Sequence, residues 1–305
     1  MNKEQTSLHI PTYLKEGNKI GLISTARKIS KNELQGAIES IKSWGLEVVL
    51  GQNLFNNYHQ FSGRDDERAK DLQAMLDNPE VKAILVVRGG YGTVRIIDHI
   101  DFSKFQKNPK WLAGYSDITV LHSQIHKLKV ASLHSTMPIN FSTNTSESIK
   151  SLKDALFGKK LSININYNSL NRFGEVKGQI VGGNLSILYS LIGSPSDLNT
   201  DGKILFIEDL DEYLYHIDRM MMNLKRNGKL TKLAGLIVGE MSDMNDNTIP
   251  FGKNAIEIIT ESVSEYDYPV AFNFPAGHID NNNTIILGQT ASLKIDHNNS
   301  NLTFY

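Results

Sequence analysis

Short apolar runs and helix-like stretches alternate along the first half of the chain. Residues 18–24, 46–50 and 82–87 are apolar runs bounded by small or polar residues, a pattern typical of buried strands. Residues 31–44 and 65–77 lie between these runs and carry apolar side chains at helical spacing. Strands that alternate with helices predict an α/β fold built on a mainly parallel sheet with right-handed crossovers.

Two glycine-containing segments directly follow predicted strands in this half. RGGYG occupies residues 88–92, and GYSD occupies residues 114–117. Ligands of parallel α/β sheets bind outside the carboxyl ends of the strands. We therefore expect both segments to lie on one edge of the sheet and to form the functional site.

The second half of the chain has a different character. Residues 141–176 are polar, turn-rich and rich in asparagine, which indicates a domain boundary or a crossing segment. Beyond it, residues 203–210 and 233–240 are predicted strands, and residues 213–226 are a predicted helix. The predicted division is an N-terminal α/β domain, a linker and a C-terminal domain, at residues 1–145, 146–175 and 176–305.

Composition and charge narrow the class of protein. A chain of 305 residues is long enough for two domains or one large α/β domain. The formal net charge of −1 gives no overall field that would attract nucleic acid or an anionic membrane. Cysteine is absent, which excludes disulfides, thiolate metal sites and a cysteine nucleophile. The chain shows neither a signal-peptide core nor a bilayer-spanning stretch, so we expect a cytoplasmic protein without nucleic-acid or membrane partners.

Ser116 lies in a predicted strand-to-helix turn, where hydrolases often expose a nucleophilic serine. The pattern Gly-x-Ser-x-Gly is only half present, because Gly114 matches its first glycine whereas Ile118 stands in place of the second. A serine or aspartate at such a position can instead cap a helix, and Ser116 or Asp117 suits that role. The local sequence leaves both interpretations open.

The three glycines of RGGYG allow the backbone to approach a ligand closely and to adopt positive φ. Backbone N–H groups in such a turn can bind an oxyanion or a phosphate. The segment matches neither the dinucleotide-binding fingerprint nor the phosphate-binding loop, which disfavours a nucleotide ligand. A tight turn without a ligand is the alternative.

An acidic cluster ends a predicted strand in the second half. Glu208 closes the apolar run, where a carboxylate can orient a histidine and stabilise its charged form. Asp209, Asp211 and Glu212 are more typical of a solvated helix start, where negative charge favours the helix dipole. A metal site is disfavoured, because only His216 lies near the cluster.

Histidines supply the candidate base. His278 lies in a predicted loop, as the general base of a serine hydrolase does. His122 and His126 share a predicted helix face, but HSQIH lacks the glutamate of the zinc-binding motif, so we interpret them as ordinary helix residues. The order Ser116, Glu208, His278 matches the nucleophile, acid, histidine order of α/β-hydrolases.

Taken together, these segments resemble the serine LD-carboxypeptidase family. That family contains the muramoyltetrapeptide carboxypeptidases and the microcin C self-immunity peptidases. The resemblance covers nearly the whole chain and rests on five stretches, RGGYGTVRIIDHIDF, GYSDITVLH, GQIVGGNLSILYSLIGSPSD, ILFIEDLDEYLYHIDRMMMNLKRNGKL and PAGHIDNNNTIILG. The segments KIGLISTA and FSGRDDERAKDL also fit the family.

The resemblance implies a Ser–Glu–His triad, with Ser116 as nucleophile, Glu208 as acid and His278 as base. It implies an oxyanion hole formed by the backbone N–H groups of Gly90 and Asp117. The family fold has an N-terminal glutamine-amidotransferase-like domain and a smaller β-rich C-terminal domain that supplies Glu and His. The active site is then expected between the two domains, and a homodimer is expected because family members commonly form one.

The expected activity is that of a serine peptidase releasing the terminal D-alanine from murein tetrapeptides in peptidoglycan recycling. The reaction would pass through an acyl-enzyme and need no metal or cofactor. One alternative is a microcin-immunity-type peptidase that cleaves peptidyl or aminoacyl nucleotides. The RGGYG form favours the recycling branch, since the glycine motif of the microcin branch typically departs from it. The other alternative is a non-catalytic peptide- or phosphate-binding protein, against which an intact triad argues.

Two further features concern substrate recognition. A carboxypeptidase must bind a free terminal carboxylate, and Arg88 is the candidate from its position and charge beside the glycine turn. A structural ion pair is the alternative role for Arg88. Family members often carry His-Gly-Pro-Met where this chain has HSTMP, at residues 134–138. We expect that segment to lie near the site and to influence substrate detail.

Overall fold

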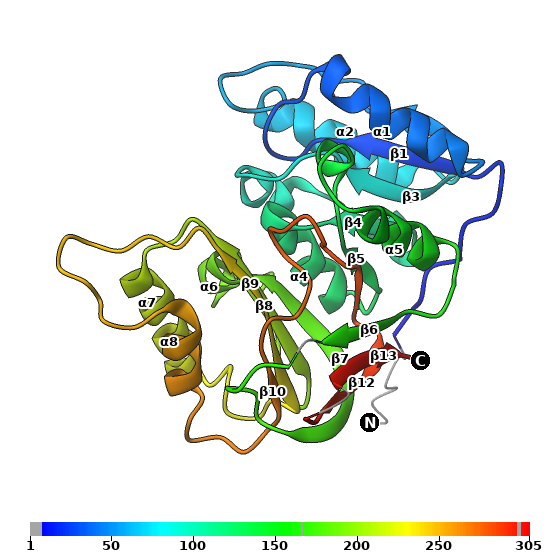
Figure 1. The fold of residues 1–305 in the computed structure, drawn as a ribbon. Helices are drawn as coiled ribbons and strands as arrows, with labels where there is room; N and C mark the ends of the chain where they lie inside the picture. Colours follow the sequence, from blue (N-terminus) through cyan, green and yellow to red (C-terminus); the bar gives the residue numbers. More distant parts are fainter. Residues whose placement is uncertain (1–7, 166, 298–299) are drawn as a thin grey trace, which may run out of the picture.

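A six-stranded sheet forms the part of the molecule that carries the first half of the chain (Figure 1). The computed structural model describes residues 8–165, 167–297 and 300–305. The strand order is β11-β5-β4-β3-β1-β2, with β1 to β5 parallel and β11 antiparallel at one edge. The strands are β1 (Lys19–Ile23), β2 (Glu47–Leu50), β3 (Val81–Val86), β4 (Trp111–Gly114), β5 (Ser132–His134) and β11 (Ile285–Leu287).

Helices cover both faces of this sheet. On one face, α1 and α5 bury apolar side chains such as Leu34 and Leu152 in one core cluster. On the other face, α2, α3 and α4 bury side chains such as Leu72 and Leu121 in a second cluster. The helices are α1 (Lys31–Ser43), α2 (Asp65–Asp77), α3 (Ser103–Lys107), α4 (Thr119–Lys127) and α5 (Ser146–Leu156), with short 3₁₀ helices η1 (Thr93–Arg95), η2 (Ile97–His99), η3 (Ser116–Ile118) and η4 (Pro138–Asn140).

A second sheet of seven strands carries most of the remaining chain, in the order β10-β9-β8-β7-β12-β13-β6. The strands β7 to β10 run parallel, and β12, β13 and β6 are antiparallel additions. The strands are β6 (Ser162–Ile165), β7 (Gly174–Asn184), β8 (Ile204–Leu210), β9 (Gly235–Ser242), β10 (Val270–Ala271), β12 (Thr290–Ile295) and β13 (Ser300–Phe304). The helices are α6 (Leu185–Leu191), α7 (Leu214–Arg226) and α8 (Ala255–Ser262).

The two sheets share a continuous apolar core. One face of the second sheet is covered by α6, α7 and α8, which form a third cluster with residues such as Met220 and Ile258. The other face sends Ile180 and Phe206 into the same cluster as α1 and α5 of the first sheet. The carboxyl ends of β4 and β8 therefore belong to two layers that are packed against each other.

The sheets do not divide the chain at single positions. Strand β11, late in the chain, returns to the first sheet and pairs with β5. Strand β6, within the predicted linker, forms an edge of the second sheet. The domain boundaries at residues 145 and 175 therefore stay a prediction.

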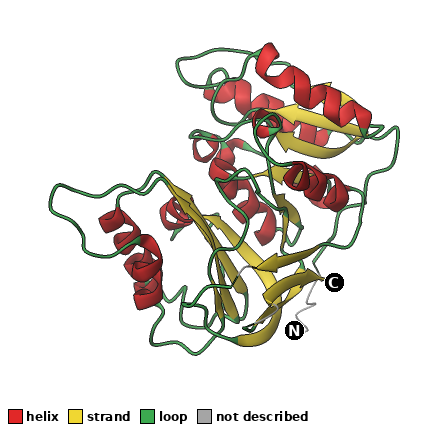
Figure 2. Cartoon of the chain, viewed as in Figure 1, coloured by secondary structure: helices red, strands yellow, loops and turns green. Residues whose placement is uncertain are grey.

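The fold class predicted from the sequence is confirmed (Figure 2). The helix predicted at residues 65–77 is α2 with the same bounds, and the helix predicted at residues 31–44 is α1, one residue shorter. The strands predicted at residues 203–210 and 233–240 correspond to β8 and β9. Within the described ranges, none of the helices is long and apolar enough to cross a membrane.

Candidate active site

Ser116 occupies a strained turn between β4 and the helices that follow it. Strand β4 ends at Gly114, and Ser116 begins η3, which continues into α4. The φ angle of Ser116 is +64°, in the left-handed region that costs a non-glycine residue about 1–2 kcal/mol. Backbone strain of this kind persists only when the surroundings enforce it, and it concentrates at functional sites. The strand-to-helix turn predicted for a nucleophile is therefore present.

Buried neighbours hold this turn in place. Gly114 has φ of +155°, and a Cβ there would lie 3.0 Å from Cγ1 of Ile118, which is fully buried. His122 Nε2 lies 2.9 Å from the Gly114 carbonyl, and its Nδ1 lies 2.8 Å from Ser132 Oγ. Burial lowers the pKa of His122 to about 3, so this ring is neutral and acts as a structural hydrogen-bonding group. The interpretation of His122 as a residue without catalytic or metal-binding function agrees with these contacts.

The RGGYG turn lies directly against Ser116. A Cβ added to Gly89 would lie 3.0 Å from Ser116 Cβ, so only glycine leaves room for the serine. Gly90 and Gly92 have φ of +109° and +147°, which favours glycine at both positions. The two glycine-containing segments therefore meet at one edge of the sheet, as the sequence predicts.

Two backbone N–H groups at this junction are available to a ligand. In the part of the chain that the structure describes, the N–H groups of Gly90 and Asp117 donate to no protein acceptor. The Asp117 side chain is buried, and its Oδ2 accepts a 2.8 Å hydrogen bond from the N–H of Thr93. Asp117 thus links the loop after β4 to the loop after β3 and fixes the two free N–H groups relative to each other.

Arg68 supports the glycine turn from below. This α2 residue is buried, and its Nη1 donates to the carbonyl oxygens of Gly92, at 3.0 Å, and of Thr25. Its guanidinium pairs with Asp65 and lies 4.8 Å from the centre of the Phe61 ring. The sequence analysis missed this residue, because an arginine on a helix surface looks solvated until its distant partners are known.

Glu208 and His278 form a buried pair. His278 Nδ1 lies 2.7 Å from Glu208 Oε2, and the Glu208 side chain is fully buried at the end of β8. Burial alone would lower the pKa of His278, but the negative charge and hydrogen bond of Glu208 outweigh it and raise that pKa. Burial opposes ionisation of Glu208, but the two adjacent histidines outweigh it and lower the Glu208 pKa to about 2. The pair is therefore a carboxylate that orients a histidine.

His134, the first residue of HSTMP, approaches the other oxygen of the same carboxylate. Its Nε2 lies 3.8 Å from Glu208 Oε1, and both side chains are fully buried. Both ring nitrogens of His134 and Glu208 Oε1 have no hydrogen-bond partner among the described residues. The expectation that HSTMP lies near the site is thus met by His134, which brings β5 of the first sheet against β8 of the second.

Tyr115, the residue before Ser116, lies against His278. Its ring centre lies 4.8 Å from that of His278 and 5.9 Å from that of His134. Ser116, the next residue, makes no hydrogen bond to His278 within the described ranges. Catalytic hydrogen bonds are often long before the substrate binds, and they tighten in the complex. The structure therefore shows the Glu208–His278 pair formed and the residue before Ser116 in contact with His278.

Arg88 is already engaged in the protein. Its Nη1 donates to the Lys28 carbonyl at 3.1 Å and lies 3.6 Å from Glu33 Oε1. Glu33 also accepts from the N–H of Ser30 in the capping box of α1. The ion pair left open by the sequence is therefore present, and the role of Arg88 in binding a substrate carboxylate stays a prediction.

The acidic cluster after β8 differs from the sequence expectation at one position. The prediction of a solvated helix start is wrong for Asp209, which is buried and accepts from Asn184 Nδ2 and the N–H of Ser186. Burial and the neighbouring Glu208 raise the pKa of Asp209 to about 7. Glu212 pairs with His216 at 2.5 Å. Searching the described residues finds no group of three or more histidines and acids arranged to hold a metal ion.

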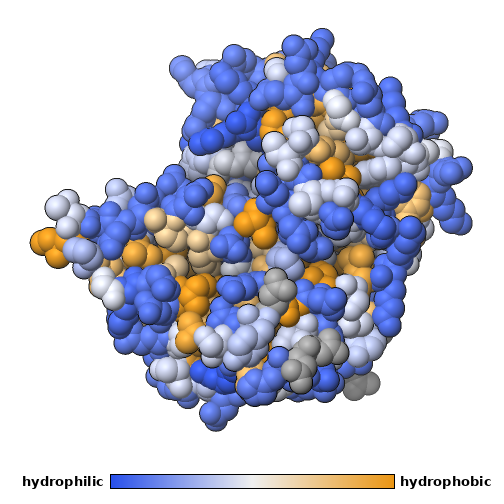
Figure 3. Space-filling model, in the orientation of Figure 1, coloured by the Kyte–Doolittle hydropathy of each residue, from blue (hydrophilic) through white to orange (hydrophobic). Residues whose placement is uncertain are grey.

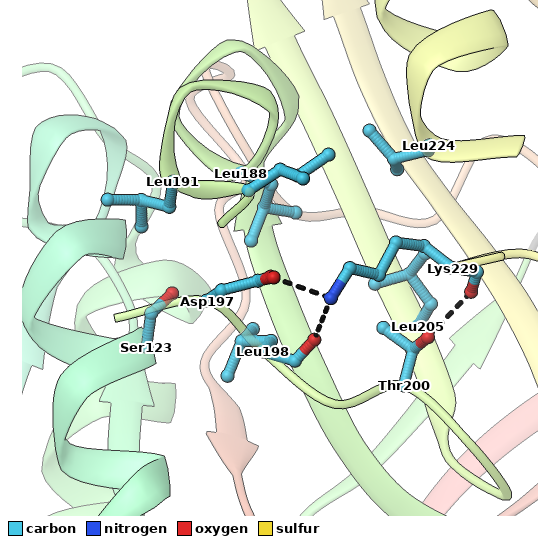
Figure 4. A pocket seen from close by; sticks show the side chains of 10 residues that line it. Ser123, Leu188, Leu191, Asp197, Leu198, Thr200, Leu205, Leu224 and Lys229 are labelled. Carbon is cyan, nitrogen blue, oxygen red and sulfur yellow. Dashed lines mark hydrogen bonds and ion pairs between the residues drawn. The ribbon is translucent and has the colours of Figure 1, made fainter. Parts of the chain in front are cut away.

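A separate apolar pocket lies beside α6 and β8 (Figure 4). Its wall is mainly leucine, including Leu188 and Leu205, and its lining contains none of Ser116, Glu208 and His278. Asp197 and Lys229 project into it and pair with each other at 2.7 Å. The two charged groups of this pocket neutralise each other, and the rest of its wall is mostly apolar. We therefore do not assign the functional site to this pocket.

The surface is hollowed on the side where the loops after β3 and β4 face the second sheet (Figure 3). The strained Ser116 and the two free N–H groups come from the loops of the first sheet, and the buried Glu208–His278 pair comes from β8 and the loop after β10 of the second sheet. This geometry is that of a serine hydrolase whose site lies between two layers.

Comparisons with known proteins agree with this class. A model of the LD-carboxypeptidase N-terminal domain matches residues 20–135, and one of the C-terminal domain matches residues 177–293. A probable murein peptide carboxypeptidase of Bacillus subtilis is 35% identical, over 93% of this chain and 91% of that protein. The murein tetrapeptide carboxypeptidase of Pseudomonas aeruginosa is 25% identical, over 90% of this chain and 93% of that protein. The chain therefore belongs to the LD-carboxypeptidase family.

Solved structures extend the likeness to the whole fold. The muramoyltetrapeptide carboxypeptidase from Oxalobacter formigenes has a TM-score of 0.87 and 27% identity, covering 94% of this chain and 98% of that one. The microcin C7 self-immunity protein MccF has a TM-score of 0.86 at 23% identity, covering 97% of this chain and 98% of that one, which shows a shared fold. The family resemblance read from the sequence is thus confirmed.

The strain at Ser116 predicts that a glycine variant is more stable than an alanine variant there, the reverse of the order expected within a helix. Because glycine tolerates positive φ and alanine does not, Ser116→Gly is expected to be more stable to unfolding than Ser116→Ala, by about 1 kcal/mol. Ser40 in the last turn of α1 is the matched control, where the alanine variant is expected to be more stable than the glycine variant by up to about 1 kcal/mol. Chemical denaturation of the four variants measures both differences. If the alanine variant were more stable than the glycine variant at both positions, Ser116 would not be strained.

Proposed function

We propose that this protein is a serine LD-carboxypeptidase that releases the terminal D-alanine from murein tetrapeptides. The observation that carries the proposal is the buried Glu208–His278 pair beside the strained Ser116 and its two free N–H groups. Membership of the LD-carboxypeptidase family, together with relatives named for murein peptides, supports the substrate class.

The first half of the reaction forms an acyl-enzyme. Ser116 Oγ attacks the carbonyl carbon of the L-residue that precedes D-alanine, and His278 accepts the serine proton at Nε2. Glu208 holds Nδ1 and stabilises the imidazolium. His278 then passes the proton to the nitrogen of D-alanine, the C–N bond breaks, and free D-alanine leaves.

Water completes the reaction by the same route. His278 removes a proton from water, the hydroxide attacks the ester carbon, and the proton returns to Ser116 Oγ as the tripeptide leaves. The N–H groups of Gly90 and Asp117 donate to the negative oxygen of each tetrahedral intermediate. Loss of one such donor typically costs about 10²–10³ in rate. We further expect this enzyme to act in the cytoplasm as a homodimer.

The direct test is D-alanine release from a purified murein tetrapeptide by the parent protein and by Ser116→Ala. The parent is expected to release D-alanine, and the variant is expected to lose several orders of magnitude in kcat, because the nucleophile is removed. Equal release by both would remove Ser116 as the nucleophile. Release only from peptidyl or aminoacyl nucleotides would favour the microcin-type alternative.

The pH dependence of the reaction follows from the Glu208–His278 pair. His278 must be neutral to accept a proton, so kcat/KM is expected to rise with pH through a His278 pKa that lies above its ordinary value. Glu208→Gln removes the charge that favours the imidazolium, so the rise should move to lower pH while kcat falls by up to about 10⁴.

Glu212→Gln is the control for this pH profile, because Glu212 pairs with His216 instead of His278. It is expected to leave the pH of the rise unchanged. A Glu208→Gln profile that rises at the same pH as the parent would show that Glu208 does not set the protonation of the base.

A further inference from the structure

None of the described residues that take part in the proposed mechanism binds the terminal carboxylate of the substrate. An enzyme that removes one C-terminal residue distinguishes its substrate from an internal peptide by the free carboxylate, which an arginine binds well through its two-pronged guanidinium. Arg88, the sequence candidate, already contacts Glu33 and the Lys28 carbonyl. Arg68 and Arg95, the other arginines around the glycine turn, pair with Asp65.

Arg27 lies on the glycine turn itself. Its backbone N–H donates to the Gly89 carbonyl at 3.3 Å, and its carbonyl accepts from Ser24 Oγ at 2.7 Å. Its side chain crosses Gly90, since a Cβ at that glycine would lie 2.6 Å from Arg27 Cδ and 2.8 Å from Arg27 Nε. The backbone of Arg27 is therefore fixed, and its guanidinium begins directly over the residue whose N–H is the proposed oxyanion donor.

The charge of Arg27 is not neutralised by the protein. The residue is exposed, and within the ranges that the structure describes its guanidinium has no ion pair and no hydrogen bond. A cation kept free beside a reactive serine is available to an anionic ligand. Its position differs from that of Arg88, whose nearest carboxylate belongs to α1.

We propose that Arg27 binds the terminal carboxylate of the substrate and thereby makes the enzyme specific for a C-terminal residue. This inference rests on the proposed carboxypeptidase function. When the carbonyl oxygen under attack lies at the Gly90 N–H, the terminal carboxylate is one residue further along, and residues are spaced about 3.8 Å apart. The Arg27 guanidinium begins over Gly90, so it is long enough to reach a carboxylate one residue beyond the carbonyl under attack. Glycine at position 90 serves two purposes, because it exposes its N–H and leaves room for the Arg27 side chain.

The test compares a murein tetrapeptide with the same tetrapeptide amidated at its C-terminus. The parent protein is expected to prefer the free acid, because the amide offers Arg27 no charge. Arg27→Gln is expected to lower kcat/KM for the acid by about 10- to 100-fold, the usual worth of a hydrogen bond to a charged group, and to leave the amide unchanged. Arg27→Lys should retain part of the preference, since it keeps the charge and loses the two-pronged geometry.

Lys28→Gln is the matched control, because it removes a neighbouring exposed positive charge that lies on no part of the proposed site. It is expected to keep the acid-to-amide ratio of the parent. An unchanged ratio in Arg27→Gln would overturn the proposal. If Arg88→Gln lost the preference for the acid over the amide while Arg27→Gln kept it, carboxylate binding would be assigned to Arg88 instead.

A binding measurement separates this inference from the proposed function. Calorimetric titration of Ser116→Ala with the acid and the amide is expected to show the same preference, and Ser116→Ala combined with Arg27→Gln is expected to lose it. If the parent hydrolyses neither peptide, the proposed function fails, and the titration still decides the role of Arg27. Equal affinity of Ser116→Ala for acid and amide would overturn the inference.

Discussion

The site depends on one buried carboxylate. Glu208 is fully inaccessible to solvent, and a buried charge costs several kcal/mol unless a partner compensates it. His278 contacts one carboxylate oxygen and His134 faces the other. The backbone is shaped around this group, because a Cβ at Gly277 would lie 2.9 Å from Glu208 Oε2. Removal of His278 would leave the buried Glu208 charge without its hydrogen-bonded partner, so the fold itself depends on this pair.

The path of the chain explains how two layers supply one site. Glu208 lies near the carboxyl end of β8 in the second sheet. The loop that carries His278 follows β10 of the same sheet and leads into β11, which returns to the first sheet. There Ile285 pairs directly with His134 on β5, next to the strand that leads to Ser116. The loop with His278 is thus anchored to both sheets, through β10 at one end and β11 at the other.

The sequence predicts the elements and the meeting of the two glycine-containing segments well, because apolar periodicity and glycine placement are local signals. It predicts partners poorly. The burial of Asp209, the ion pair of Arg88 and the support of the glycine turn by Arg68 all depend on residues that the fold brings from a distance. Arg27 gives no local signal either, since only the packing of its side chain over Gly90 distinguishes it from any exposed arginine.

The role proposed for Ser116 is that of a nucleophile activated by His278. Covalent labelling with a fluorophosphonate, followed by mass spectrometry of the peptides, tests it without assuming a substrate. The parent protein is expected to be labelled at Ser116, and His278→Ala is expected to be labelled far more slowly, since the serine then keeps its proton. Labelling at another residue, or labelling of Ser116 at the same rate without His278, would contradict it.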